Sequence, residues 1–180
     1  MKKAFVWVLI FAMVLGLVGC SSDSSGVTME NLITAYNSKM SESKQIDTFQ
    51  VSETDDGFSF EKDHISGTMD KQKNINHIKF VNENVACENF SSKNSILALI
   101  DKILEQDMDN LYIADLNAHD CISQIEILYN VCFKDRKYSF DEACDILTSK
   151  EPVKIEEWTI SVSIDETNGI ATIEAAYNNQ

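Results

Sequence analysis

The feature that most constrains the fold is a change in hydrophobic period that occurs twice along the chain. Residues 28–42 place apolar side chains at helical spacing, and residues 48–82 then alternate apolar with polar side chains. The helical period returns from residue 91, and alternation returns over residues 157–177. Because a helix buries one stripe and an antiparallel strand buries one face, this order predicts helices packed on one face of a sheet.

Turn sequences divide the alternating segments into strands. Residues 54–57 (TDDG) and 70–74 (DKQKN) separate apolar alternating runs in the first segment, which predicts a four-strand antiparallel meander. Asn168-Gly169 predicts a hairpin in the last segment. We therefore expect the α+β class, with a meander, a C-terminal hairpin and helices on one face. The order of helix then hairpins occurs twice, but too loosely to define a repeat.

Two or three helices are expected between the two sets of strands. They begin near residue 91, at Asp120 and at Ser139, where Ser139 and Glu142 have the spacing of a capping box. Cys121 and Cys132 share a face of the middle helix and lie about 16 Å apart along it, beyond the reach of a disulfide. Buried free thiols are the favoured prediction, and a disulfide between Cys132 and Cys144 is the alternative.

The start of the chain has the composition of an export signal. Lys2 and Lys3 precede an uncharged run from Ala4 to Val18, and Gly19 and Cys20 follow it. The run is shorter than the roughly 20 apolar residues that cross a bilayer. The segment after it is rich in serine and too polar to remain in lipid.

The sequence LVGC at residues 17–20 resembles the lipobox of bacterial lipoproteins. The resemblance implies a signal peptide over residues 1–19, cleavage before Cys20 and acyl chains such as palmitate on that cysteine. It implies a partner, the cell membrane, and a location on its extracytoplasmic face. Residues 20–27 would then form a lipidated, Ser-rich tether, and residues 28–180 a single domain. The alternative is an uncleaved signal anchor or an ordinary secretory signal.

Charge excludes one class of partner. The chain carries a formal net charge of −14, which becomes −16 once Lys2 and Lys3 are removed with the signal. Nucleic-acid binders need clustered basic residues, and Arg136 is the only arginine in the sequence. An acidic domain is also repelled by anionic lipid, so we expect it to stand off the membrane surface.

Residues 115–126, expected between two helices, partly match a calcium-binding loop. Four side chains stand at the spacing of calcium ligands: Asp115, Asn117, Ser123 and Glu126. His119 and Asp120 occupy the fifth and sixth positions, although the sixth requires glycine. The alternative is a helix connection in which Asp120 caps the second helix and Gln124 faces water. No metal or cofactor is expected from so incomplete a match.

The other candidate groups give no catalytic motif. His64 and His77 are predicted on the polar face of the sheet, where adjacent strands would make them a metal-binding pair. His119 and Cys121 lack zinc-ligand spacing. The chain has no GxSxG elbow and no Gly-rich phosphate loop, and Asp101 with Glu105 predicts a solvated helix face.

We therefore expect a membrane-anchored binding module rather than an enzyme. Its partner would be an envelope protein, a peptide or a small ligand close to the membrane. The polar face of the sheet offers one conceivable contact surface, formed by Ser59, Ser66, Thr68, His77 and Lys79. The alternative function is a small cell-envelope hydrolase without a recognisable motif.

Overall fold

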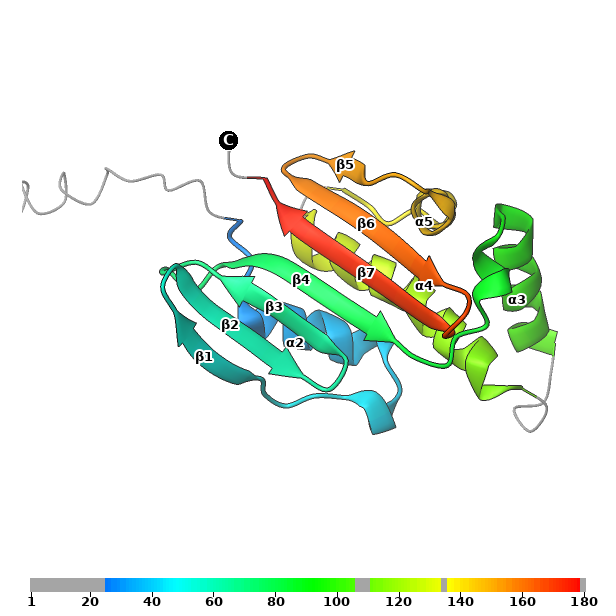
Figure 1. Ribbon diagram of the computed structural model, residues 1–180, viewed down its shortest axis with the longest axis horizontal. Coiled ribbons are helices and arrows are strands. Elements are labelled where there is room, and N and C mark those ends of the chain that lie inside the picture. Colours follow the sequence, from blue (N-terminus) through cyan, green and yellow to red (C-terminus); the bar gives the residue numbers. More distant parts are fainter. Residues whose placement is uncertain (1–24, 106–110, 134–135, 179–180) are drawn as a thin grey trace, which may run out of the picture.

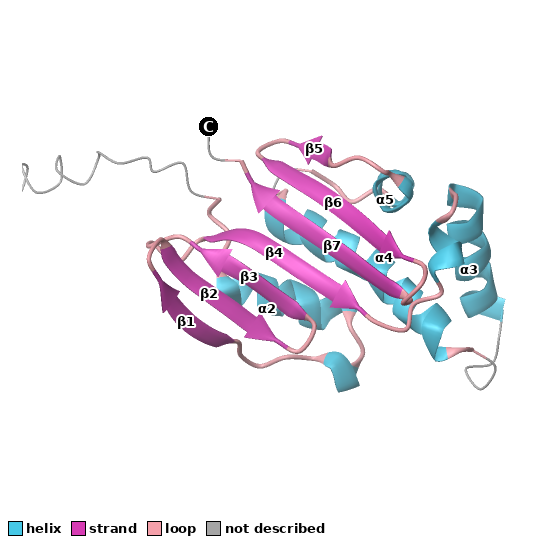
Figure 2. Cartoon of the chain, viewed as in Figure 1, coloured by secondary structure: helices cyan, strands magenta, loops and turns pink. Residues whose placement is uncertain are grey.

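The structure is a computed structural model that describes residues 25–105, 111–133 and 136–178. Cys20 and the predicted signal lie outside the described residues. The described chain forms a seven-stranded antiparallel sheet in the order β1-β2-β3-β4-β7-β6-β5 (Figures 1 and 2). The strands are β1 (Gln50–Thr54), β2 (Gly57–Lys62), β3 (Ile65–Met69), β4 (Ile75–Asn82), β5 (Val153–Ile155), β6 (Trp158–Asp165) and β7 (Ile170–Tyr177).

Helices cover one face of this sheet. In Figure 1, α2 and α4 lie behind the strands, while α3 and α5 flank the β6 side. The helices are α2 (Met29–Lys39), α3 (Lys93–Glu105), α4 (Ile113–Cys132) and α5 (Phe140–Thr148), with 3₁₀ turns η1 (Glu42–Lys44) and η2 (Cys87–Phe90). The predicted α+β class and four-strand meander are confirmed. The predicted hairpin gains a third strand, β5, which is too short for alternation to reveal.

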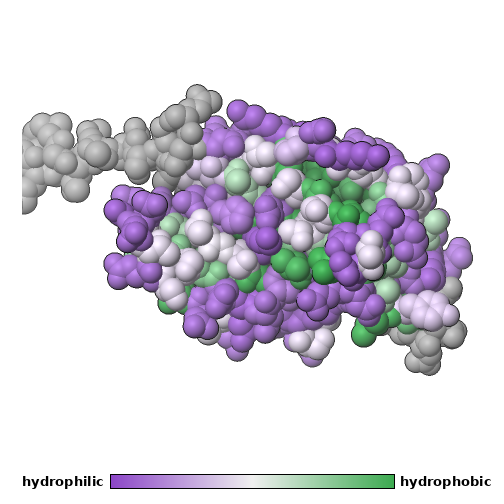
Figure 3. Space-filling view, in the orientation of Figure 1, coloured by the Kyte–Doolittle hydropathy of each residue, from purple (hydrophilic) through white to green (hydrophobic). Residues whose placement is uncertain are grey.

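The core lies between the sheet and the helices. Large apolar side chains from both layers are almost completely buried, among them Tyr36, Phe60, Phe80, Leu128 and Trp158. The opposite face of the sheet has no helix over it within the described residues. Figure 3 views that face and shows hydrophilic and intermediate residues around a group of hydrophobic residues near the centre.

The strands form two sets that meet at β4 and β7. These strands pair antiparallel at the centre of the sheet, with Lys79 opposite Glu174 and their charged groups 2.8 Å apart. Each strand ends one meander, and α2 and α4 underlie the two halves. Tyr36 and Tyr129 occupy equivalent places, because the residue that caps each helix donates its N–H to that tyrosine's carbonyl at 3.0 and 3.2 Å. Both halves thus contain a helix that is capped four residues after a buried tyrosine, beneath an antiparallel set of strands.

One predicted helix start is wrong. α4 begins at Ile113 rather than at Asp120, since the polar residues of its first turns are matched by tertiary partners described below. The predicted start at Ser139 is confirmed, because Ser139 is the N-cap of α5, but the predicted capping box is not formed: the Ser139 side chain makes no capping bond, and Glu142 accepts from Tyr129. A capping box does occur at α2, between Thr28 and Asn31.

The cysteines behave as the helical spacing predicts. Four cysteines within the described ranges are buried and free: Cys87, Cys121, Cys132 and Cys144. Cys121 and Cys132 lie on the core side of α4, and burial raises the pKa of both thiols. The alternative disulfide between Cys132 and Cys144 is not formed.

Candidate functional site

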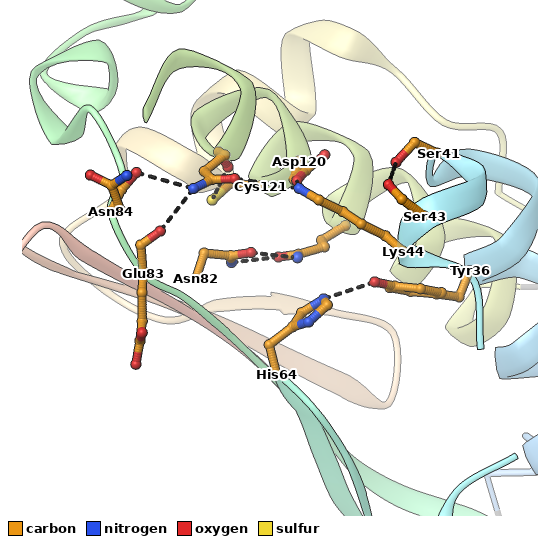
Figure 4. A network of polar contacts seen from close by, with 12 residues as sticks. Tyr36, Ser41, Ser43, Lys44, His64, Asn82, Glu83, Asn84, Asp120 and Cys121 are labelled. Atoms are coloured by element: carbon orange, nitrogen blue, oxygen red, sulfur yellow. Dashed lines mark hydrogen bonds and ion pairs between the residues drawn. The ribbon is translucent and has the colours of Figure 1, made fainter. Parts of the chain in front are cut away.

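A polar pocket of about 520 Å³ opens where four elements meet. The β2–β3 turn contributes Asp63 and His64, and the end of β4 contributes Glu83. Lys44 comes from η1, and Asp120 comes from the first half of α4. Figure 4 shows Lys44 directed toward Asp120 and His64 directed toward Tyr36. The pocket thus brings together side chains that are far apart in the sequence.

His64 forms one wall and is held by the buried Tyr36. Its Nε2 lies 2.8 Å from the Tyr36 hydroxyl, and its carbonyl accepts from the Val81 N–H at 2.9 Å. Burial, followed by the charge of Lys44, lowers the pKa of His64. Burial also raises the pKa of Tyr36. The hydroxyl therefore keeps its proton and shares a hydrogen bond with a neutral imidazole.

The prediction that His64 lies on the polar face of the sheet is wrong. His64 belongs to the tight turn between β2 and β3, where Asp63 has a φ of 50°. A turn breaks the alternation of side chains, so the strand pattern does not fix the direction of the imidazole. It points instead to the helix side of the sheet, toward Tyr36.

Lys44 and Asn117 connect the elements that form the opposite wall. The Lys44 ammonium forms an ion pair with Asp120 and donates to Oδ1 of Asn117 at 3.3 Å. The Asn117 amide in turn donates to the carbonyls of Glu83 and Asn84, at 3.0 and 3.2 Å. These bonds join η1, α4 and the end of β4, so the pocket is formed before any ligand enters.

A buried amide pair supports the pocket from below. Asn82 and Gln124 exchange two hydrogen bonds of 2.8 Å, one in each direction. Gln124 has no exposed surface, contrary to the prediction that it faces water. Buried amides without partners are costly, so this pair fixes the position of α4 on β4.

The partial calcium loop is not a loop. Residues 115–126 all lie within α4, which places Asp115 and Glu126 about 16 Å apart along the helix axis. Asp115 forms an ion pair with Lys102, and Glu126 forms one with Lys39. Ser123 lies on the same helix as these residues and, like Asn117, points to no common centre with them. Across the described ranges, no group of three His, Cys, Asp or Glu residues is placed to hold a metal ion.

The three histidines are separated. His77 lies on β4 opposite Thr68 and Ala176, not beside His64, so the predicted cross-strand pair does not exist. Its Nε2 is 4.0 Å from a Glu174 carboxylate oxygen on the uncovered face. His119 lies within α4.

The uncovered face carries the polar surface that alternation predicts. A shallow depression of about 280 Å³ lies there over β1 to β4. Its lining includes Ser59, Ser66, Thr68 and His77 from the predicted set. Lys79 also lies on this face, paired with Glu174. The depression is smaller and is lined only by neighbouring strands, whereas the His64 pocket is formed by four separate elements, so the latter is the stronger candidate.

The His64 pocket has charges that favour binding over nucleophilic chemistry. Lys44 and Asp120 neutralise each other, while the carboxylates of Asp63 and Glu83 have no ion-pair or hydrogen-bond partner among the described residues. Two candidate nucleophiles lie beside the pocket, the Tyr36 hydroxyl and the Cys121 thiol, and burial raises the pKa of both. Neither group forms its anion easily.

Sequence reasoning missed Tyr36, Lys44, Asp63 and Glu83. Asp63-His64 stands between two predicted strands, and a polar pair in a tight turn was the one local signal that could have marked the pocket.

No protein-family model matches the chain, and no curated protein or solved structure matches it either. Of the helices in the described part, none has the length and apolar character needed to span a bilayer.

Proposed function

We propose that this protein is a lipid-anchored extracytoplasmic binding protein whose pocket takes a small polar ligand with a positively charged group. The observation that carries the proposal is the preformed pocket that joins Lys44, His64 and Asp120, and whose lining includes the exposed residues Asp63 and Glu83, with carboxylates unpartnered within the described ranges. Ligand sites are commonly preformed concavities with a few convergent polar groups.

Electrostatics support a cationic ligand. With Lys44 and Asp120 paired and His64 neutral, the remaining formal charges in the pocket are those of Asp63 and Glu83. The formal net charge of −14 adds long-range attraction for cations. Free N–H donors on an ammonium or guanidinium group would satisfy both carboxylates.

The position of the tether supports a role at the membrane. The Val27 carbonyl accepts from the Ile75 N–H at 2.7 Å, so the packed domain begins beside the first residue of β4. The pocket lies at the other end of β4, about 24 Å away at the usual rise of a strand. A lipid on Cys20 would therefore hold the domain with the pocket directed away from its point of attachment.

The alternative function, a hydrolase, has less support. His64 is the only imidazole that lines the pocket, and its Nε2 is occupied by the Tyr36 hydroxyl. Acyl transfer needs a nucleophile within hydrogen-bond reach of such a base. The hydroxyl that occupies this place keeps its proton, so binding accounts better for the arrangement.

The anchor is tested with the full-length chain in a bacterium that processes lipoproteins. Wild-type protein should incorporate an alkyne-labelled palmitate and fractionate with the membrane. Cys20→Ser should lose the label, because it removes the sulfur that forms the thioether. Cys87→Ser is the matched control, since Cys87 is buried and free within the domain. Equal labelling of both variants, or an unlabelled wild-type protein, would overturn the anchor.

The ligand class is tested by calorimetry of the same protein with matched probes. N-acetyl-lysine amide should bind, while the uncharged N-acetyl-norleucine amide and the anionic N-acetyl-glutamate should not. Asp63→Asn and Glu83→Gln should each weaken binding by about tenfold, the effect of losing about 1.4 kcal/mol. Glu157→Gln is the control, because Glu157 lies in the equivalent turn of the other half, between β5 and β6.

Two results would contradict the proposed ligand class. Equal affinity for the lysine and norleucine probes would show that charge is not recognised. If Glu157→Gln weakened binding as much as Asp63→Asn does, the loss would reflect the overall negative charge of the protein and not a defined site. Ester hydrolysis that disappears in His64→Gln would instead favour the hydrolase.

A further inference from the structure

The two edges of the sheet differ in their protection against pairing. The outer strand at one edge, β5, has three residues and directly follows Pro152. The outer strand at the other edge, β1, has five residues, all of them exposed, and contains neither proline nor lysine. Very short strands, proline and charged side chains, above all lysine, are the usual devices that block edge pairing. β1 has neither proline nor lysine and carries a single charge, Glu53, and within the described ranges no other strand pairs with its outer edge.

The hairpin determines which backbone groups of β1 face outward. Thr54 pairs with Gly57 across the two-residue turn that joins β1 to β2. The residues that flank such a turn bond to each other, and successive residues direct their backbone groups to opposite sides. Gln50, Ser52 and Thr54 therefore bond to β2. Val51 and Glu53 present their N–H and C=O groups to the free edge.

We propose that β1 pairs antiparallel with β1 of a second copy of this chain, with Ser52 opposite Ser52 of that copy. In this register Val51 lies opposite Glu53 in both directions, and the outward groups of these residues form four backbone hydrogen bonds. Gln50 lies opposite Thr54. Two seven-stranded sheets would then join into one continuous sheet.

Charge selects this register over its neighbours. A shift of two residues in one direction places Glu53 opposite Glu53, and like charges directly opposite destabilise a strand pair. The shift in the other direction pairs Glu53 with Phe49, which precedes β1 and has its side chain buried in the core. Only the register centred on Ser52 uses the whole strand without opposing acids. Val51, which is 50% exposed, would also lose exposed apolar surface there.

The overall charge makes the pairing dependent on conditions. Two chains of formal charge −14 repel each other at long range, so added salt should strengthen the association. Four backbone bonds make a small interface, which predicts weak association for free chains. If the anchor proposed above holds, confinement to one membrane raises the effective concentration of the partner strand.

The test is disulfide trapping with the full-length chain in membranes under a mild oxidant. Residues opposite each other at a non-hydrogen-bonded position have Cα atoms about 4.5 Å apart, which a disulfide can bridge. Ser52→Cys should give a cross-linked dimer, and faster in high salt than in low salt. Lys154→Cys is the matched control, because Lys154 is exposed at the middle of the opposite edge strand, β5. The parent protein controls for Cys20, and the four domain cysteines are buried.

A second variant separates strand pairing from random collision. Val51→Pro removes an N–H that faces outward and leaves the bonds between β1 and β2 in place. Combined with Ser52→Cys, it should reduce cross-linking at least tenfold while the circular dichroism of the purified protein stays unchanged.

Three results would overturn the proposal. Equal cross-linking of Ser52→Cys and Lys154→Cys would indicate random collision. Cross-linking that persists with Val51→Pro would exclude backbone pairing at β1. No dimer from Ser52→Cys at any salt concentration, in protein that incorporates the palmitate label and fractionates with the membrane, would exclude the interface. None of these results depends on the pocket or its ligand.

Discussion

The two halves of the molecule place equivalent tyrosines under the sheet but give them different partners. Tyr36 bonds to His64, which faces an open pocket, whereas Tyr129 bonds to Glu142, which is paired with Arg136. Both tyrosines are buried at the last turn of their helix. The fold therefore requires an aromatic side chain at this place but leaves its polar partner free to vary, so His64 is not imposed by the fold.

The largest expected effect concerns the packing of the two halves. Gly67 on β3 corresponds to Val162 on β6, since the first pairs with Ile78 and the second with Ile173. A Cβ on Gly67 would lie 2.1 Å from the His77 carbonyl oxygen and 2.4 Å from the Phe60 ring. Gly67→Val should lower the free energy of unfolding by about 3 kcal/mol, because neither the strand nor the ring can easily move away.

The matched change in the other half is Val162→Gly. Val162 is partly buried against the core and has no strand pairing on its β5 side. Its loss should cost about 1 to 2 kcal/mol through lost burial and added chain entropy. Urea unfolding of both variants checks the order. A Gly67→Val protein as stable as wild type would show that the packing at Gly67 is no tighter than the packing at Val162.

The second effect concerns the tyrosine hydroxyls. Tyr36→Phe and Tyr129→Phe each remove one hydrogen bond and should each cost about 1 kcal/mol of unfolding free energy. Only Tyr36→Phe should also change the pKa of His64, since the Tyr36 hydroxyl contacts Nε2 directly. Proton NMR titration of His64 measures this shift, and Tyr129→Phe is its control. Identical His64 titrations in both variants would show that the Tyr36 hydroxyl does not influence the pKa of His64.

The smallest effect is the pH dependence of stability. The pKa of His64 is lowered from 6.5, so the unfolded state takes up its proton first as pH falls. Stability should therefore decline below about pH 6.5 and level off below the folded pKa. His64→Gln should remove this part of the profile in denaturant unfolding. An unchanged slope between pH 7 and 5 would contradict the burial of a neutral imidazole.

Glu142 gives the contrasting pH range in the other half. Its hydrogen bond from Arg136 is the main cause that lowers its pKa from 4.5. Stability from this group is present above the usual carboxyl pKa and is lost as pH falls through the lowered one. Glu142→Gln should therefore flatten the profile only below about pH 4.5. A change in the stability profile of Glu142→Gln near pH 6 would mean that the titration of His64 depends on Glu142.

Much of the fold could be predicted because burial acts on local patterns. The four-strand meander follows from alternation and turn residues, and the shared face of Cys121 and Cys132 follows from helical spacing. β5 was missed because three residues give too short a pattern. The start of α4 was misplaced because Asp115 and Asn117 look like loop residues until Lys102 and the carbonyls of the two residues after β4 are known to pair with them.

The sequence by itself determined the α+β class, the acidic charge and the resemblance of its first twenty residues to a lipoprotein signal. These depend on periodicity and composition, which are local properties of the chain. Only the tertiary structure decided that Lys44, Asp63, His64 and Asp120 meet in one pocket. A site built from four separate elements depends on long-range contacts that leave no regular spacing in the sequence.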